Sequence, residues 1–366
     1  MSRTRPSSVS LSEKSIPPQC IQPVCPVFGQ CGGCQYQDIP YEKELALKEQ
    51  ALRDLLNVLC ISSDAWQPIV PSPKQYHYRC RLDLKMIRTR AGEFFMGFSP
   101  RGRYRVVPVE ACPLALEPIS DFLPRLKETA IQSWRPKYRN ANLVVKTGDD
   151  GRVFWGGIGR RSLRQDPADC LWTVINGRRI HYGLDTFFQA NLSILPVLFE
   201  RIKDLNILAQ DGTLFDLYGG VGLFGSGLYD EVGRVVLLEE NKYAVGLARV
   251  NGAYNRMGRF QIIAGRVEEQ DLAALRHAGQ GRAVGIIDPP RKGLDGQAAR
   301  LATDLRWMTH LLYLSCQPEA LARDLQVFIT AGWQVVQVIP FDFFPRTRHL
   351  ETLVLLGPVS SESMRR

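Results

Sequence analysis

The spacing of apolar residues changes along this chain, and each change indicates a different kind of structure. Residues 1–24 show no periodicity and are rich in serine, proline and basic side chains, which predicts a flexible tail. From Tyr41 to Leu59 apolar residues recur at helical spacing, so we expect one helix there. The residues expected on its apolar side are Leu45, Leu52, Leu55, Leu56 and Leu59.

Short alternating runs of apolar and polar residues fill the stretch from about residue 75 to 185. Examples are "RCRLDLKMIRTR", "EFFMGFS" and "NLVVKTG", and glycine, proline, asparagine and aspartate separate them. Alternation with a period of two is typical of strands with one buried face. We therefore predict a central β-rich domain over residues 75–185, mostly antiparallel, with one helix near residues 117–133.

After residue 186 the predicted strands are longer apolar runs, with helices or loops between most of them. The runs are "TLFDLYGG", "RVVLLEEN", "FQIIAG", "AVGIIDPP", "HLLYLSC", "WQVVQVIPFDFF" and "ETLVLLG". This order is typical of a mainly parallel sheet covered by helices on both faces. We therefore assign the chain to the α/β class, with a Rossmann-like C-terminal domain over residues 186–358 and a tail at 359–366.

Charge and hydropathy narrow the class of protein. The 366 residues include 46 Lys and Arg against 37 Asp and Glu, which gives a net charge of +9, and the pI is about 9.1. An excess of positive charge suits a polyanionic partner such as nucleic acid. No apolar run reaches signal-peptide length or the roughly 20 residues of a membrane span. We expect a soluble, cytoplasmic protein without a membrane partner.

Nine cysteines lie between Cys20 and Cys316, an odd number without the arrangement of a disulfide framework. Three of them, Cys25, Cys31 and Cys34, surround two glycines in "CPVFGQCGGCQYQ". Structural disulfides are rare in a reducing compartment, so short ligand-like spacings of this kind indicate a metal or iron–sulfur site.

A glycine-rich loop follows the first strand of the C-terminal domain. In "FDLYGGVGLFG", Gly219, Gly220 and Gly222 allow the backbone to approach a ligand closely at the carboxyl edge of a sheet. About 20 residues later, "VVLLEEN" ends the next strand with a carboxylate that can accept both ribose hydroxyls. A glycine loop alone is often only a tight turn, but the loop, strand and acid together indicate an adenosine cofactor. Glu239 is the better-placed acid, and Glu240 is the second choice.

Three further segments carry reactive side chains at predicted strand ends. Asp288 follows a buried strand in "IIDPPRKGLD", Cys316 follows another in "LLYLSCQPEA", and Glu351 precedes the last strand in "RHLETLVLL". Each also has a purely structural interpretation: a proline-rich turn, an inert buried thiol and a solvated charge at a strand start. Because groups able to carry positive charge precede Glu351 closely, we expect its carboxylate to be ionised. These groups are Arg346, Arg348 and His349.

Taken in chain order, these segments resemble those of the RNA 5-methyluridine methyltransferases, the family that methylates C5 of uracil in bacterial 23S rRNA or in tRNA. The matching segments are "CPVFGQCGGCQYQ", "FFQAN", "DLYGGVG", "LLEEN", "DPPRKG", "SCQP" and "RHLET", and the resemblance covers about residues 25–357. It implies S-adenosyl-L-methionine as the cofactor. The residues that match the family's cofactor contacts are Gln189, Tyr218, Glu239 and Asp288.

The same resemblance implies a covalent mechanism. C5 of uracil is too weakly nucleophilic to attack a methyl sulfonium directly, so a nucleophile must first activate the ring. By resemblance, the Cys316 thiolate adds to C6 and C5 of the resulting enolate takes the methyl group. Glu351 then removes the C5 proton as Cys316 is released. The sequence leaves open whether Arg291 or Arg348 stabilises the enolate oxygen.

In this family a C-x5-C-x2-C run with one distant cysteine binds a [4Fe–4S] cluster. By resemblance, residues 25–74 form a cluster segment with a helix, and Cys20 is a rival ligand. Four thiolates also suit a structural zinc ion. Methyl transfer moves no net electrons, so we expect the cluster to fold the N-terminal segment and to shape an RNA-binding face. The expected ligands are Cys25, Cys31, Cys34 and Cys112.

A uracil inside a helix hides both faces of its C5–C6 bond, so the target must lie in a loop or be flipped out. Basic and aromatic residues that suit such an RNA gather in "YHYRCR", "RGRYR", "WRPKYR" and residues 346–349. Only 24 residues precede Cys25, so we expect no N-terminal β-barrel RNA-binding domain. The cysteine-rich start favours 23S rRNA as the RNA partner, and we infer no obligate protein partner.

Three alternatives stay open. The first is a tRNA uridine-C5 methyltransferase. The second, from another class, is a non-catalytic Fe–S or zinc RNA-binding protein, which the presence of Cys316 and Glu351 disfavours. The third is methylation of an amino nitrogen through "DPP", which needs no cysteine nucleophile.

Overall fold

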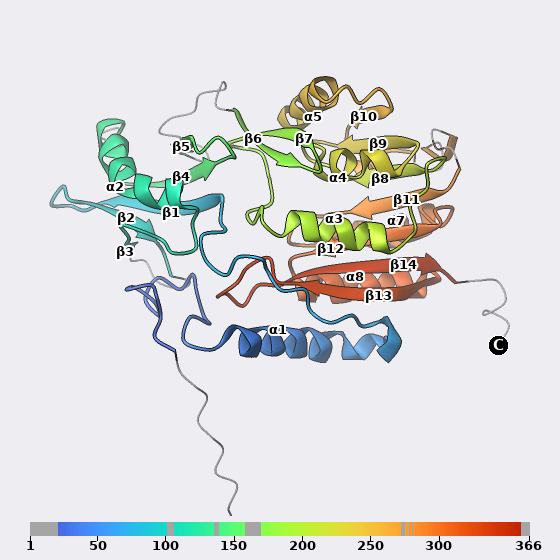
Figure 1. The fold of residues 1–366 in the computed structure, drawn as a ribbon, viewed down its shortest axis with the longest axis horizontal. Helices are drawn as coiled ribbons and strands as arrows, with labels where there is room; N and C mark the ends of the chain where they lie inside the picture. Colours follow the sequence, from blue (N-terminus) through green and yellow to red (C-terminus); the bar gives the residue numbers. More distant parts are fainter. Residues whose placement is uncertain are drawn as a thin grey trace, which may run out of the picture.

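The computed structural model describes residues 21–100, 106–134, 139–157, 170–271, 275–277, 279 and 281–359. In these ranges a large sheet with helices on both faces lies beside a smaller sheet with one helix (Figure 1). The large sheet is built from the C-terminal part of the chain and the smaller one from the middle part. Both the α/β character of the C-terminal part and the β-rich character of the central part are therefore confirmed.

The large sheet has seven strands in the order β10-β9-β8-β11-β12-β14-β13. The pairings from β10 to β12 are parallel, whereas β14 runs antiparallel to both of its neighbours. Each of the seven apolar runs in the sequence supplies one strand. They are β8 (Thr213–Leu217), β9 (Arg234–Glu239), β10 (Phe260–Ala264), β11 (Ala283–Ile287), β12 (His310–Ser315), β13 (Trp333–Phe341) and β14 (Glu351–Pro358).

The strand order reverses between β8 and β11. From β8 the chain builds β9 and β10 outward on one side, and it then crosses to β11 and β12 on the other side. The loops that leave β8 and β11 at their carboxyl ends therefore diverge and leave a crevice between them. Open α/β sheets bind ligands in this crevice, so the topology predicts a ligand-binding site at this edge of the sheet.

Two apolar cores cover the opposite faces of the large sheet, because successive side chains of a strand alternate between faces. From β12, Leu312 and Leu314 join the core under α3, α4 and α5, whereas Leu311 and Tyr313 join the core under α1, α7 and α8. The helices are α1 (Tyr41–Leu56), α3 (Leu195–Asp204), α4 (Leu223–Gly227), α5 (Lys242–Tyr254), α7 (Ala298–Asp304) and α8 (Pro318–Thr330). Short 3-10 turns lie at Asn57–Leu59, Ser63–Ala65, Tyr229–Glu231, Val267–Glu269 and Asp295–Gln297.

Helix α1 buries Leu52 and Leu56 as its leucine pattern predicts, but its buried face also includes charged residues. Leu45, Leu55 and Leu59 are only partly buried. The reason is an ion pair: Lys48 Nζ lies 2.7 Å from a carboxylate oxygen of Asp342, which the far end of the chain supplies. The helix therefore docks through charged groups as well as leucines. Its buried residues are Tyr41, Glu44, Lys48, Leu52 and Leu56.

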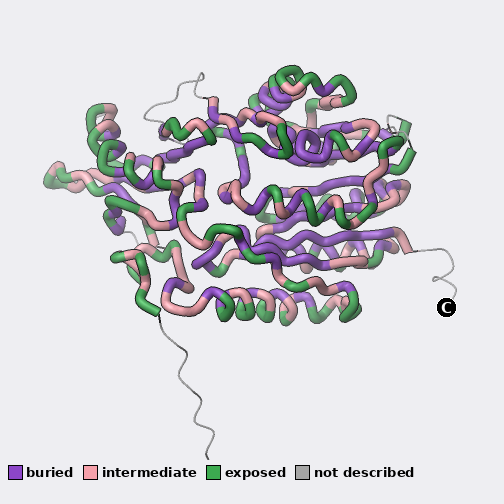
Figure 2. The backbone as a smooth tube through the Cα atoms, in the orientation of Figure 1, coloured by how far each residue is buried: buried purple, intermediate pink, exposed green. Residues whose placement is uncertain are grey.

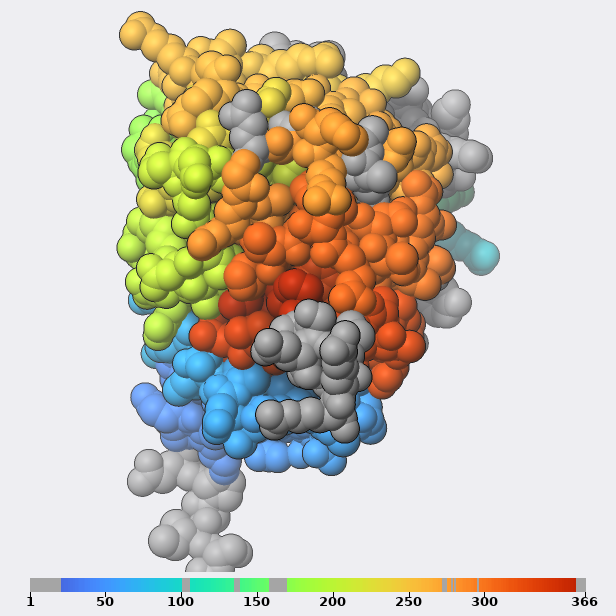
Figure 3. Space-filling view, turned by 90° about the vertical axis from the view of Figure 1, so that its right-hand side faces the viewer, coloured from blue at the N-terminus to red at the C-terminus, as the bar shows by residue number. Residues whose placement is uncertain are grey.

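Helix α1 and the segment after it cover one edge of the large sheet. Trp66 and Val70 bridge in parallel to Val338 and Phe341 of β13, and α1 packs against α8. Figure 3 shows this proximity from the end of the molecule, where the blue N-terminal segments lie directly under the red and orange C-terminal ones. Covering an edge strand blocks its pairing with other chains. Part of the predicted cluster segment is thus packed on the C-terminal domain.

The smaller sheet is antiparallel with the strand order β3-β2-β1-β4-β5. Helix α2 (Glu117–Gln132) packs on one face and closes a separate apolar core. This confirms the predicted helix near residues 117–133. The strands are β1 (Arg81–Arg88), β2 (Phe94–Phe98), β3 (Val107–Pro108), β4 (Asn140–Thr147) and β5 (Val153–Gly157).

A hairpin of β6 (Cys170–Ile175) and β7 (Arg178–Gly183) packs on the large unit and is also hydrogen-bonded to β4 of the smaller sheet, where Lys146 donates to the Gly183 carbonyl and Tyr182 donates to the Thr147 carbonyl. Strand β7 lies against α5, and Leu171, Ile180 and Tyr182 are buried in the core that contains α3. A two-stranded hairpin needs such a partner because it is marginally stable alone. The predicted central domain to residue 185 therefore contributes its last two strands to the packing of the C-terminal domain.

The burial pattern follows this architecture. Figure 2 shows that the strands of the large sheet are mostly buried, whereas the outer faces of the helices carry the exposed residues. Among the described helices, none combines the length and the apolar composition that crossing a bilayer requires.

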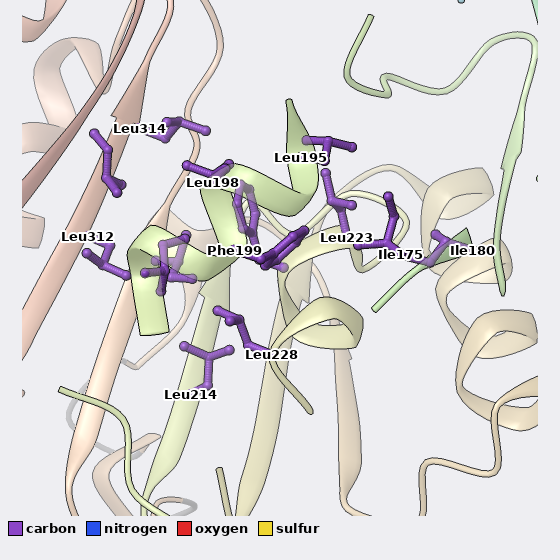
Figure 4. Packing of buried hydrophobic residues seen from close by; sticks show 14 of the residues in the cluster. Ile175, Ile180, Leu195, Leu198, Phe199, Leu214, Leu223, Leu228, Leu312 and Leu314 are labelled. Atoms are coloured by element: carbon purple, nitrogen blue, oxygen red, sulfur yellow. The ribbon is translucent and has the colours of Figure 1, made fainter. Parts of the chain in front are cut away.

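We predict that Leu198→Ala destabilises the protein by about 2 to 5 kcal/mol, because it leaves a cavity in a core that cannot fully collapse. Leu198 is 0% exposed and lies on α3 among Leu214, Leu228 and Leu312 (Figure 4). The free energy of unfolding from a urea titration measures the effect. The matched control is Leu47→Ala on α1, which is 44% exposed and should change stability by less than about 0.5 kcal/mol. Equal effects of the two variants would contradict this assignment of the core.

Candidate active site

A cavity of about 1010 Å³ lies at the carboxyl edge of the large sheet. It is lined by residues at the ends of β8, β9, β11 and β12, by the first residue of β14 and by residues of the smaller unit, including Arg79 and Arg81. All six candidate catalytic and cofactor residues from the sequence therefore meet in one place. They are Cys316, Glu351, Gln189, Tyr218, Glu239 and Asp288.

The pairing of β12 with β14 places Cys316 next to Glu351. Ser315 pairs with Thr352 in the antiparallel ladder, so the next pair outward consists of Cys316 and Glu351. Because β14 runs against β12, the start of one strand meets the end of the other at the same edge. Two residues that are far apart in sequence thus face the same cavity from adjacent strands.

Burial disfavours the ionised form of both the Cys316 thiol and the Glu351 carboxyl group in the ligand-free protein. Burial, followed by the charge of Glu351, raises the pKa of Cys316 to about 12, although the Arg291 guanidinium opposes the shift. Burial and the neighbouring Asp288 raise the pKa of Glu351 well above its usual range, and Arg291 again opposes the shift. The resting cavity therefore holds a neutral thiol at neutral pH, because the low dielectric of a buried site disfavours charge.

The ionised state expected for Glu351 stays a prediction, but the charged neighbours of its carboxyl group differ from those that the sequence suggested. Sequence proximity had pointed to Arg346, Arg348 and His349 as its cationic neighbours. In the structure Arg346 is 4% exposed and bonded to the N-terminal segment, and Arg348 is exposed. The cation that acts on Glu351 is Arg291, from the loop after β11.

The glycine loop is held against the end of β9. Tyr218 and Gly220 adopt left-handed backbone conformations, with φ of 62° and 56°. The Gly220 N–H donates to Glu239 Oε2 at 2.9 Å, and the Asn241 N–H donates to Glu239 Oε1 at 2.7 Å. A carboxylate accepts more than two hydrogen bonds, so Glu239 can fix the loop and still receive ribose hydroxyls. Glu240 also lines the cavity, but it pairs with an exposed arginine.

Two neighbouring aspartates, Asp288 in the cavity wall and Asp216 next to it, have raised pKa values. Gln189 Nε2 donates to Asp288 Oδ2 at 3.4 Å, and burial with the nearby Asp216 raises the pKa of Asp288 to about 7. Asp216 accepts the Gly225 N–H at 2.9 Å, and burial raises its pKa to about 7. Sequence reasoning missed Asp216, although a carboxylate inside the apolar run "TLFDLYGG" is a signal that could have identified it.

Arg79 was missed as an individual residue, although its segment "YHYRCR" drew attention as basic and aromatic. It lines the large cavity and also a second, smaller cavity. Its guanidinium lies over the rings of Tyr78 and Phe344, each at 5.8 Å. Arg79 therefore forms part of the wall between the two cavities.

The second cavity, of about 40 Å³, is lined by all four expected ligand cysteines. They are free thiols, and burial raises the pKa of Cys25, Cys34 and Cys112. A bound cation would reverse that shift, since metals bind the thiolate. The donor set of four thiols therefore fits an iron–sulfur cluster or a soft metal. In the described ranges, no three His, Cys, Asp or Glu side chains are gathered closely enough to hold a single metal ion.

The remaining cysteines and RNA-binding candidates lie elsewhere. Cys20 and the segment "RGRYR" at 101–105 are outside the described residues, as are residues 135–138 of "WRPKYR". Cys80 is buried and donates from Sγ to the Gln189 carbonyl at 3.4 Å, so it supports the cavity wall. Arg346 was predicted to contact phosphates, but this is wrong because the side chain is buried.

Comparison with known proteins gives a consistent picture. The family model described as tRNA (Uracil-5-)-methyltransferase matches residues 163–359. Two proteins described as uncharacterized RNA methyltransferases each align over 92% of this chain and 84% of their own length. The one from Clostridium tetani is 28% identical and the one from Thermotoga maritima is 27% identical.

A solved structure has the same overall fold. It is the Pyrococcus abyssi tRNA (uracil-54, C5)-methyltransferase in complex with S-adenosyl-L-homocysteine. Its TM-score is 0.67 at 22% sequence identity, and the match covers 88% of this chain and 85% of that one. At this level of identity the likeness establishes the fold.

We predict that alkylation of Cys316 by iodoacetamide is slow at neutral pH in the ligand-free protein. Below the pKa the thiolate fraction rises about tenfold per pH unit, so the rate should rise with that slope between about pH 7 and 9. Peptide-resolved mass spectrometry separates Cys316 from the other thiols. A plateau below about pH 8 would show that the thiol is already activated.

Arg291→Gln should slow this alkylation at every pH, because it removes the cation that lowers the pKa of Cys316. Arg323→Gln is the matched control, since Arg323 is exposed and bonds the Lys292 carbonyl on the outside of the same loop. If both variants slow the alkylation of Cys316 equally, the cause is a movement of the whole loop and not the loss of the Arg291 charge.

Proposed function

The chain belongs to the tRNA (uracil-5-)-methyltransferase family, whose model matches more than half of its length, and we propose that it methylates C5 of a specific uridine in 23S rRNA. Membership of the family makes it an RNA (uracil-C5) methyltransferase. The proposal adds the RNA that it modifies, the residues that carry the reaction and the groups that it binds.

One observation carries the assignment of the catalytic residues: Cys316 and Glu351 line the same cavity from adjacent positions of β12 and β14. In the proposed reaction the Cys316 sulfur bonds to C6 of uracil, its proton leaves to water, and the ring electrons move onto O4 to give an enolate. Once C5 carries the methyl group, the Glu351 carboxylate takes the C5 proton. The C5–C6 double bond re-forms and the C6–S bond breaks, which releases the Cys316 thiolate.

The rest of the cavity wall supports the binding of S-adenosyl-L-methionine. This cofactor, when bound, supplies a methyl group on a positively charged sulfonium. We assign its ribose hydroxyls to Glu239 and its other contacts to Gln189, Tyr218 and Asp288, which surround the glycine loop at the sheet crevice. Carboxyl groups with raised pKa suit a cationic ligand, because a nearby positive charge favours their ionised forms.

Arg291 is the better candidate for stabilising the enolate oxygen. It lines the cavity and its charge acts on both Cys316 and Glu351. Among the described residues that line this cavity, Arg348 is not present. A guanidinium beside a developing oxyanion stabilises the negative charge and so lowers the barrier.

We predict that 5-fluorouridine-substituted 23S rRNA traps the enzyme in a denaturant-stable adduct when S-adenosyl-L-methionine is present. Fluorine at C5 cannot leave as a proton, so the step assigned to Glu351 fails and the C6–S bond persists. Cys316→Ala should abolish the adduct on a denaturing gel, whereas the matched control Cys60→Ala, at an exposed thiol, should leave it unchanged.

The same gel decides between the candidate functions. An adduct with 5-fluorouridine tRNA and none with rRNA would keep the chemistry and change the substrate to tRNA. Methylation that survives Cys316→Ala would indicate a nitrogen acceptor. No adduct with either RNA, from protein that binds S-adenosyl-L-methionine, would favour a non-catalytic RNA-binding protein.

We also propose that Cys25, Cys31, Cys34 and Cys112 hold a [4Fe–4S] cluster. Their convergence on one small cavity supports this, since three come from the N-terminal segment and the fourth from the loop after β3. When bound, the cluster supplies a covalent link between these two parts of the chain. Its expected role is structural, because methyl transfer moves no net electrons.

We predict that protein purified without oxygen contains about four iron and four sulfide per chain. Cys112→Ser should lower both contents and the stability, because the link between the two segments is lost. Cys170→Ser is the matched control, since Cys170 is a partly buried free thiol in β6. If the protein instead contains one zinc ion per chain and no sulfide, the four cysteines form a structural zinc site and not a cluster.

A further inference from the structure

The carboxylate of Glu351 lacks a side-chain partner that could hold it in place. Within the described part of the chain no side chain donates a hydrogen bond to it, although the charges of Asp288 and Arg291 act on it. Its position therefore depends on the backbone at the start of β14 and on the loop that leads there. We call residues 342–349 the base loop.

The base loop is bonded to helix α1 through a buried group of four charges. Lys48 Nζ lies 2.7 Å from Glu44 Oε1 and 2.7 Å from Asp342 Oδ1, and Arg346 lies 3.6 Å from the other Glu44 oxygen. Each of the four residues is at most 4% exposed. Two cations and two carboxylates balance in charge, so the group is stable only when all four stay together.

Arg346 joins the base loop to the segment that follows Cys34. Its carbonyl accepts the N–H groups of Gln35 and Tyr36 at 2.9 and 3.2 Å. Its guanidinium donates to the carbonyls of Tyr36 and Ile39 at 3.3 and 3.1 Å and to the Gln75 side chain. Its backbone has a φ of 66°, a conformation that a non-glycine residue keeps only when its surroundings enforce it.

We propose that Arg346 is a positioning residue for the proton-removing step, which couples the cysteine segment to Glu351. The inference rests on the proposed function, because it takes Glu351 as the base and Cys316 as the nucleophile. Arg346 lies five positions before Glu351 and is not among the residues that line the cavity, and its bonds tie the base loop to the N-terminal segment. When these bonds are lost, Glu351 moves relative to C5 while Cys316, which directly follows β12, stays in place.

Arg346→Lys separates this role from a general loss of structure. Lysine keeps the positive charge but cannot donate in the three directions that the guanidinium uses. With ordinary uridine RNA and S-adenosyl-L-methionine labelled in the methyl group, wild-type protein should release product without accumulating an adduct. The Lys variant should accumulate a labelled, denaturant-stable adduct, and its release of 5-methyluridine should be slower by about 10- to 100-fold.

The fluorinated RNA supplies the internal control. Because fluorine blocks the base step in every variant, Arg346→Lys should form the 5-fluorouridine adduct at the wild-type rate. The matched substitution is Arg53→Lys, which alters another ion pair of α1, with Glu49, on its partly exposed side. Arg53→Lys should behave as wild type with both RNAs. If wild-type protein itself forms no fluorinated adduct, the proposed function fails, whatever Arg346 does.

Two results would overturn the proposal. One is wild-type product release by Arg346→Lys without an adduct. The other is an equal loss of fluorinated adduct and of product, which would place the defect before proton removal. If Arg346→Lys does not fold, Gln75→Ala is the second variant, because it removes one acceptor of the Arg346 guanidinium. Gln75→Ala should accumulate the same labelled adduct to a smaller extent. If this variant accumulates no adduct, the proposal is also overturned.

A separate variant tests the coupling between the cysteine segment and the base loop. Cys34→Ser should accumulate the same labelled adduct, since Gln35 bonds the base loop through its N–H and its side chain. Combined with Arg346→Lys it should add little, because both changes release the same loop. Fully additive effects, or no adduct with Cys34→Ser, would show that the cysteine segment does not act through Arg346.

Discussion

The reversed direction of β14 is the constraint on which the site depends. A parallel strand in its place would put its first residue at the opposite edge of the sheet. Because β14 is antiparallel and inserted between β12 and β13, Glu351 begins its strand at the edge where β12 ends, one residue before Cys316. Backbone hydrogen bonds of the ladder therefore bring nucleophile and base to the same edge, and the cavity around them is completed by loops from the parallel half of the sheet.

The electrostatics of the cavity follow from its burial. Burial raises the pKa values of Cys316, Glu351, Asp288 and Asp216, so it disfavours negative charge in and beside the cavity. Arg291 supplies a positive charge that acts on the first two. A bound ligand with positive charge favours the ionised forms, so we expect such a ligand to lower these pKa values.

The sequence was sufficient to predict the seven strands of the large sheet, because each is a continuous apolar run next to a turn or helix signal. It also predicted the residues that line the cavity, since strand ends and glycine loops are local features. Prediction from the sequence failed where the ion-pair partners of a side chain come from distant parts of the chain. The helical pattern did not mark Lys48 and Glu44 as buried, because their partners Asp342 and Arg346 lie almost 300 residues or more away in sequence. Arg346 was grouped with RNA-contacting residues, but it is buried.

The contacts between the N-terminal segment and the base loop also determine the order in which the protein can assemble. Tyr41, Lys48 and Gln35 bond partners that are 301, 294 and 313 positions further along the chain. At ordinary rates of translation those partners emerge on the order of 15 to 60 s later. The cysteine segment is therefore synthesised before its final neighbours in the base loop. Until the base loop is made, its thiols are accessible to metal delivery or to oxidation. During this delay between synthesis of the two sides of one interface, the cell must protect the thiols from oxidation.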